Sequence, residues 1–212
     1  MSVANYRQSR LIVLSLDTPG GYVDNVESIM SIFDESAVPV LVFVEPLRAV
    51  SGGTYILMAS HVAVMKPGSV VGSCQPVSVT GEPITDSKYV NYLVKLMSSH
   101  AWLHTRNETA AELFVTRNLN LNAEEARRFQ VIDFMAEDIK DVLTKLSGYV
   151  LIKYRDGEAT RFILTTSTEA KRYQVIRTWR FENINSVAIR NFRSPSEFWS
   201  LPSYLIQFPV SL

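Results

Sequence analysis

Two glycine-containing turns, each directly after a short apolar run, constrain this chain more than any other feature. The run Leu11 to Leu16 is followed by the turn Asp17-Thr18-Pro19-Gly20-Gly21. The run Pro39 to Glu45 is followed by Ala49-Val50-Ser51-Gly52-Gly53-Thr54-Tyr55. Such runs are typical of parallel strands buried on both faces, and a helical pattern follows each. Turns of this kind direct backbone N–H groups into one crevice at the carboxyl ends of neighbouring strands.

Strands and helices alternate through the first two thirds of the sequence. The expected strands are residues 11–16, 39–44, 61–65 and 69–72, and the expected helices are 23–36, 51–59, 87–103, 108–115, 123–129 and 138–146. This alternation predicts βαβ units and a mainly parallel sheet, that is, an α/β fold. Residues 75–87 are rich in Pro, Gly, Ser and Thr and are expected to form a loop.

The composition changes after Gly148. Two strand-like runs, 149–154 and 159–164, flank Asp156-Gly157, which is a strong hairpin signal. We therefore expect an α/β body over residues 1–147 and a small β-rich appendage or juxtamembrane segment over residues 148–212. Because only ten residues precede Leu11, the body is expected to lack an opening strand–helix unit.

Charge and cysteine content exclude some classes of function. Lys and Arg number 21, as do Asp and Glu, so the net charge is zero, which argues against a nucleic-acid-binding protein. The single cysteine, Cys74, excludes an internal disulfide and is expected to be a small buried side chain. No apolar stretch is long enough to span a bilayer, and no signal segment opens the sequence.

Ser51 is the candidate nucleophile. A serine between a strand and a helix often serves only as a helix N-cap. However, two glycines follow Ser51, and the Pro19-Gly20-Gly21 turn repeats the same geometry one unit earlier. Free amides from both turns favour a nucleophile beside an oxyanion hole.

The histidines are poor candidates for the base that a serine nucleophile needs. His61 follows a helix that begins near Ser51, and at about 1.5 Å rise per residue it is expected roughly 15 Å away. His100 and His104 are four residues apart, but Ala101 stands where a zinc-binding H-E-x-x-H helix has Glu. We expect these two histidines on a solvated helix face.

Lysine is the remaining candidate base. Lys88 lies at the start of a predicted helix, where the macrodipole disfavours a cation and so favours the uncharged amine that a base requires. Apolar Tyr89 and Val90 follow it. Lys95 and Lys66 are weaker alternatives, and an ordinary surface lysine remains an alternative for Lys88 itself.

Four motifs in matching order and spacing resemble the membrane-bound serine protease domain of the NfeD family, over about residues 11–146. This stomatin-associated protease is a relative of Clp protease and signal peptide peptidase A in the crotonase superfamily. The motifs are Leu16-Asp17-Thr18-Pro19-Gly20-Gly21, Ser51-Gly52-Gly53-Thr54-Tyr55-Ile56, Pro67-Gly68-Ser69-Val70-Val71-Gly72-Ser73-Cys74-Gln75-Pro76 and Lys88-Tyr89-Val90-Asn91-Tyr92.

The resemblance implies specific roles for these residues. Ser51 matches the family's nucleophile and Lys88 its general base, while Gly20 or Gly21 and Gly52 match the oxyanion donors. It implies a Clp/crotonase-type spiral of βαβ units and a Ser–Lys peptidase that needs no metal or cofactor.

The resemblance also implies partners and a location. The expected substrate is an extended hydrophobic peptide, such as a segment of a stomatin-like membrane protein. The protease domain is expected to be membrane-associated, extracytoplasmic, and a homodimer or higher homo-oligomer.

Two other functions remain open at this point. Ala49 to Gly53 also resemble the oxyanion loop of crotonase-type acyl-CoA enzymes, for which Glu82 is the nearby candidate carboxylate. The chain also fits a non-catalytic scaffold that binds a stomatin-like partner.

Overall fold

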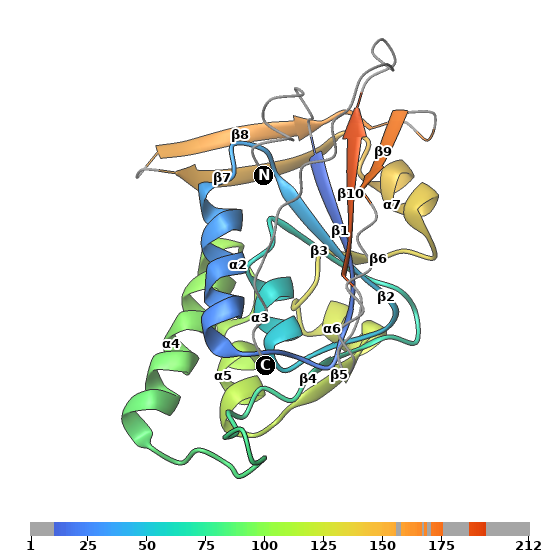
Figure 1. Cartoon of the computed structure of the whole chain (residues 1–212). Helices are drawn as coiled ribbons and strands as arrows, with labels where there is room; N and C mark the ends of the chain where they lie inside the picture. Colours follow the sequence, from blue (N-terminus) through green and yellow to red (C-terminus); the bar gives the residue numbers. More distant parts are fainter. Residues whose placement is uncertain (1–10, 156–157, 167, 169–170, 176–186, 194–212) are drawn as a thin grey trace.

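A mainly parallel sheet forms the centre of the molecule (Figure 1). The computed structural model describes residues 11–155, 158–166, 168, 171–175 and 187–193. Among these residues, the main sheet has the order β5-β4-β2-β1-β10-β9, with β3 beside β2 and β6 beside β3. Its strands are β1 (Leu11–Thr18), β2 (Val40–Val50), β3 (Val62–Met65), β4 (Val70–Gly72), β5 (Asn120–Asn122), β6 (Phe134–Met135), β9 (Lys171–Val175) and β10 (Val187–Arg193).

Parallel pairing runs through the part of the sheet that the motifs predicted. β1 pairs with β2, β2 with β3 and β4, and β3 with β6, all in parallel. β5, β9 and β10 add antiparallel pairs at the edges. The α/β class and the mainly parallel sheet are therefore confirmed. β2 is longer than expected and continues to Val50, directly before Ser51.

Alternation along the strands divides the core into two layers. Ile12, Leu14 and Leu16 face a cluster with the helices α2 (Val23–Glu35), α3 (Gly52–Met58), α4 (Ser87–Leu103), α5 (Glu108–Thr116) and α6 (Ala123–Arg128). Leu11 and Val13 face the opposite cluster, which contains α7 (Ile139–Lys145) and the hairpin strands. A period of two directs successive side chains to opposite faces, so both faces of the sheet are covered.

The region after Gly148 contributes to two sheets. β7 (Tyr149–Arg155) and β8 (Glu158–Leu164) form the expected antiparallel hairpin as a separate two-stranded sheet. The turn predicted at Asp156-Gly157 lies outside the described residues. β10 pairs with β1 and so extends the main sheet. The domain boundary at residue 147 stays a prediction.

His61 is a structural residue at the amino end of the strands. Its backbone N–H donates to Val40 O, and its Nδ1 accepts from the Val40 amide at 3.1 Å. Its Nε2 lies 2.8 Å from Lys153 Nζ, which also donates to Asp34 O, so the ring connects the hairpin to the body. Since Val40 opens β2 and Ser51 follows its end, His61 lies at the opposite end of the strands from the candidate nucleophile.

The expectation that His100 and His104 lie on a solvated helix face is wrong. His100 Nε2 lies 3.2 Å from the Asp34 carboxylate of α2, and its Nδ1 lies 2.9 Å from Leu96 O. The His104 ring lies edge-on to His61 at 5.4 Å, and its buried Nε2 has no hydrogen-bond partner among the described residues. The sequence pattern did not reveal that Asp34 of α2 and the His61 ring lie against this face.

Buried His61 and the buried Nε2 of partly exposed His104 are expected to make the fold sensitive to acid. Burial, and then the nearby cationic Lys153 and Arg106, lower the pKa of His61 to about 3. Burial likewise lowers the pKa of His104 well below its ordinary value. In the unfolded chain both rings titrate near ~6.5, so below that pH the unfolded state binds protons that the folded state does not.

We therefore predict that the free energy of unfolding falls as pH drops from about 6.5 towards 3, by up to ~1.4 kcal/mol per pH unit for each ring. Urea unfolding across this range is the measurement, and His61→Gln should flatten the slope. His100 is the control because its pKa shifts the other way. Burial alone would lower this pKa, but the hydrogen bonds to Asp34 and Leu96 raise it. The stabilisation that protonated His100 gives to the fold is present at low pH and is lost as pH rises through the raised pKa. An unchanged slope in His61→Gln would contradict this account.

Candidate active site

Ser51 occupies a strained turn between β2 and α3. Its φ is 54° and its ψ is −124°, a conformation that residues with a side chain rarely adopt and that costs about 1–3 kcal/mol. Although Ser51 stands at the N-cap position of α3, its side chain makes no capping hydrogen bond. The interpretation of Ser51 as a simple N-cap is therefore wrong, and the hydroxyl is left available at the rim of a pocket.

Glycines allow the two turns to pack against each other. A Cβ added at Gly20, whose φ is 127°, would lie 2.7 Å from Ser51 Cβ. A Cβ added at Gly52 would lie 2.6 Å from the Val26 side chain and 3.3 Å from Gly21 N. Side chains at either position would force the turns apart. The glycines therefore bring the amides of Gly21 and Gly52 close to Ser51.

The amides differ in their availability. The Gly20 N–H donates to the Thr18 hydroxyl at 3.1 Å, so it is already engaged. Within the described residues, the amides of Gly21 and Gly52 have no acceptor. Of the three glycines that the sequence indicated, Gly21 and Gly52 thus have the free donors that an oxyanion site needs.

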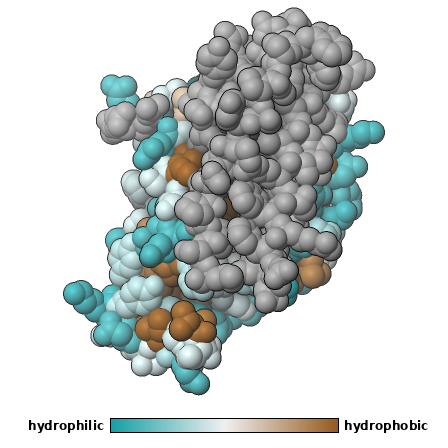
Figure 2. All heavy atoms as spheres, viewed as in Figure 1, coloured by the Kyte–Doolittle hydropathy of each residue, from teal (hydrophilic) through white to brown (hydrophobic). Residues whose placement is uncertain are grey.

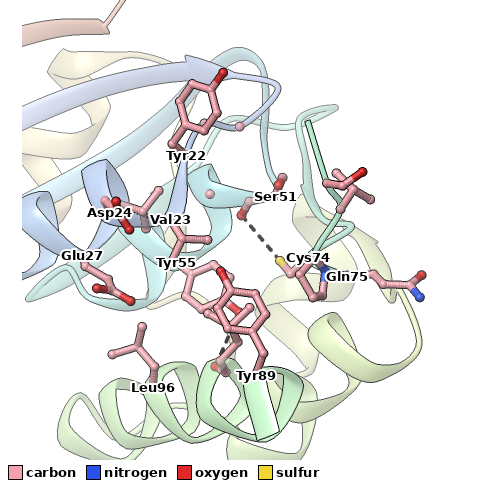
Figure 3. Close-up of a pocket in the computed structure, with 18 of the residues that line it drawn as sticks. Tyr22, Val23, Asp24, Glu27, Ser51, Tyr55, Cys74, Gln75, Tyr89 and Leu96 are labelled. Atoms are coloured by element: carbon pink, nitrogen blue, oxygen red, sulfur yellow. Dashed lines mark hydrogen bonds between the residues drawn. The ribbon is translucent and has the colours of Figure 1, made fainter. Parts of the chain in front are cut away.

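A cavity of about 480 Å³ lies beside Ser51 (Figure 3). Ser51 and Cys74 lie at one side, Asp24 and Glu27 of α2 lie at the other, and tyrosine rings lie between them. The walls are mostly apolar and aromatic, with the lining residues Tyr22, Val23, Val26, Tyr55, Pro76, Val77, Val79, Tyr89, Leu93 and Leu96. Such walls suit an extended apolar ligand.

Sequence reasoning missed several of these lining residues. Asp24 and Glu27 are the carboxylates in the pocket, whereas Glu82, the carboxylate considered from the sequence, is exposed and does not line it. Glu27 accepts a hydrogen bond from Tyr92 of α4 at 2.7 Å. The signal available in the sequence was the helical spacing of Val23, Val26 and Glu27. It places them on one face of a helix that begins directly after the first glycine turn.

Cys74 is buried, as expected. Its thiol donates to Gly72 O at 3.4 Å, and its Sγ lies 3.5 Å from Ser51 O. Burial raises the pKa of the Cys74 thiol to about 12, so the thiol stays protonated at neutral pH. Cys74 therefore packs beside Ser51 as a protonated thiol, a poor nucleophile.

The candidate bases lie outside the cavity. Lys88 is exposed in the first turn of α4, where Asp86 caps the helix by accepting from the Tyr89 amide at 2.8 Å. Tyr89 lines the cavity but Lys88 does not. Lys95 is exposed further along α4, and Lys66 follows β3. The structure does not bring any of these amines to Ser51.

A short hairpin precedes α4 and borders the cavity. Val77 pairs with Pro83, Ser78 N–H donates to Glu82 O at 2.8 Å, and Ile84 N–H donates to Pro76 O at 2.9 Å. Val77 and Val79 are exposed on it. Figure 2 shows apolar surface at this lower end of the molecule. The expected loop therefore has internal hydrogen bonds.

The steric role of Gly20 gives a direct test. Gly20→Ala should reduce labelling of Ser51 by a serine-directed fluorophosphonate by at least about tenfold, because its methyl group displaces Ser51. Gly21→Ala should have a much smaller effect, because its Cβ meets nothing within 4 Å and its N–H is kept. Equal losses in the two variants would contradict the packing described here.

Comparisons with known proteins show which family this chain resembles. Residues 1–150 match the family described as NfeD1b, N-terminal domain. The membrane-bound protease PH1510 of Pyrococcus horikoshii is 37% identical over 154 residues, which cover 70% of this chain and 35% of that protein. The chain thus spans about a third of the length of this curated relative.

Solved structures of the 1510-N protease are also similar to this chain. A lysine-to-alanine mutant of the 1510-N membrane-bound stomatin-specific protease, in complex with a substrate peptide, is similar with a TM-score of 0.72 and 34% identity, over 79% of this chain and 78% of that one. A serine-to-alanine mutant of the same protease has a TM-score of 0.69 and 34% identity, over 79% and 82% of the two chains.

The described part of this chain contains no helix that is long and apolar enough to cross a bilayer. The family match covers more than two thirds of the sequence, and it includes both glycine turns and therefore Ser51. The chain belongs to the NfeD1b N-terminal domain family.

Proposed function

We propose that this chain is a serine endopeptidase in which Ser51 is the nucleophile and Lys88 the general base. The observation that carries the proposal is the strained, uncapped Ser51 beside the free amides of Gly21 and Gly52. The relatives support it, since a protease of this family was solved with a serine or a lysine replaced by alanine.

The chemistry follows from these groups. Ser51 Oγ attacks the scissile carbonyl carbon and its proton passes to the uncharged amine of Lys88. The N–H groups of Gly21 and Gly52 stabilise the oxyanion. The C–N bond then breaks, and the leaving amine takes the proton from Lys88. Lys88 then takes a proton from a water molecule as that water attacks the carbonyl carbon of the ester. The bond between this carbon and Ser51 Oγ breaks, the acid leaves, and Ser51 Oγ takes the proton back from Lys88.

The cavity supports an apolar peptide as the substrate. Its walls are largely aliphatic and aromatic side chains from α2, α3 and α4. The relatives are named as proteases specific for a stomatin homologue, so we propose a hydrophobic segment of a stomatin-like membrane protein. The membrane-bound relative supports the proposal that the chain acts at a membrane. We also propose, from the motif resemblance, that it acts on the extracytoplasmic side and as a homo-oligomer.

Ser51→Ala and Lys88→Ala should each lower kcat for an apolar peptide on the order of 10³-fold or more, about 4 kcal/mol of barrier. The double variant should be hardly slower than either single one, because the two residues act as a unit. Lys95→Ala is the matched control, an exposed lysine on the same helix. Full turnover in Ser51→Ala would rule out the mechanism, and a loss in Lys95→Ala alone would identify another base.

Lys88 must approach Ser51 for this chemistry. We expect peptide binding to draw the hairpin of residues 76–84 and the first turn of α4 over the cavity, which also excludes water. Hydrogen exchange of residues 75–88 should therefore slow when a peptide inhibitor binds. Strong protection in the free protein, unchanged by the inhibitor, would refute this closure and favour a preformed site.

A further inference from the structure

The buried hydroxyl of Thr54 bridges three backbone segments behind Ser51. Thr54 is fully buried in the first turn of α3. Its Oγ1 lies 2.9 Å from Ala49 O and 3.0 Å from Gly72 O, and it accepts from the Gly72 N–H at 2.9 Å. It does not line the cavity, so it makes no contact with a ligand there.

The hydrogen-bonding capacity of a hydroxyl fits this position. One proton is donated to one of the two carbonyls, and a lone pair accepts the amide of Gly72. The end of β2 at Ala49, the end of β4 at Gly72 and the start of α3 are thereby held together by one side chain. A buried Gly72 N–H without this partner would lose its hydrogen bond.

The same groups hold the backbone of Ser51. Its N–H donates to Gly72 O at 2.8 Å, and its carbonyl accepts from the Thr54 N–H at 2.9 Å. On its other side, Gly72 packs closely against the Leu119 carbonyl directly before β5. A Cβ at Gly72 would clash with that oxygen. The position of Gly72, and through it that of Ser51, is thus determined by β5 on one side and by Thr54 on the other.

We infer that Thr54 is a positioning residue, whose hydroxyl keeps Ser51 in its strained conformation with Oγ directed at the cavity. This role rests on the proposed function of Ser51 as the nucleophile. The favourable bonds through Thr54 and Gly72 offset the cost of a positive φ at a residue with a side chain. Loss of the hydroxyl should leave the cavity intact and misplace the nucleophile.

The test compares three variants of the whole chain. Thr54→Val keeps the shape but removes the hydroxyl, and Thr54→Ser keeps the hydroxyl. Ser60→Ala is the matched control, since Ser60 at the other end of α3 is also fully buried and bonds to Leu57 O and Val62 O. The readouts are thermal unfolding, kcat and KM for an apolar peptide, and the rate at which Ser51 displaces fluoride from a fluorophosphonate.

We expect Thr54→Val to lower the labelling rate and kcat by about ten- to a hundredfold with KM little changed, because small misplacements of a reacting group cost that much. Thr54→Ser should keep both the labelling rate and kcat close to those of the unmodified protein. Ser60→Ala should lower the unfolding temperature but label at the unmodified rate. Unmodified labelling in Thr54→Val would overturn the positioning role alone. No labelling of the unmodified protein would instead overturn the proposed function, and this role with it.

Discussion

Ser51 joins β2 to α3 with a positive φ, and the geometry of the pocket depends on how that turn is held. A positive φ at a serine is unfavourable by itself, so its surroundings must determine it. Gly72 and Thr54 bond to the Ser51 backbone from behind, and Gly20 packs against its side chain from the front. The Ser51 hydroxyl makes no capping hydrogen bond, and Ser51 lines the cavity.

Parallel pairing explains why these contacts meet in one place. β1 and β2 run side by side, so their carboxyl ends deliver the Gly20-Gly21 turn and the Ser51 turn to the same edge. The later part of β2 pairs with β4, which brings Gly72 beside Val50. The buried polar groups at the opposite end, His61 and Lys153, attach the hairpin and take no part in the pocket. One end of the strands therefore holds the contacts that attach the hairpin, and the other end holds the candidate site.

Much of this was accessible from the sequence. The apolar runs predicted β1 to β4, and Asn122 with Glu125 forms the capping box that opens α6. The two glycine turns predicted which segments meet at Ser51, and a side chain at Gly20 would clash with the Ser51 Cβ. The motif order identified the family, which the comparisons confirm.

Other features depend on tertiary contacts that no local pattern encodes. His100 and His104 looked exposed because their partners, Asp34 on α2 and the buried His61, lie far away in sequence. Glu27 of α2 lines the pocket and accepts a hydrogen bond from Tyr92 of α4, which lies 65 residues away in sequence. Lys88 is exposed in the first turn of α4, where its neighbour Tyr89 lines the cavity and Lys88 does not.

The most direct measurement is a crystal structure of the chain after reaction with a peptide boronate that mimics the tetrahedral intermediate. The account predicts a covalent bond from boron to Ser51 Oγ, one boronate oxygen within about 3 Å of the Gly21 and Gly52 N–H groups, and Lys88 Nζ within hydrogen-bond reach of Ser51 Oγ. A boronate attached to another residue, or an oxygen that faces away from both amides with Lys88 still in solvent, would contradict it.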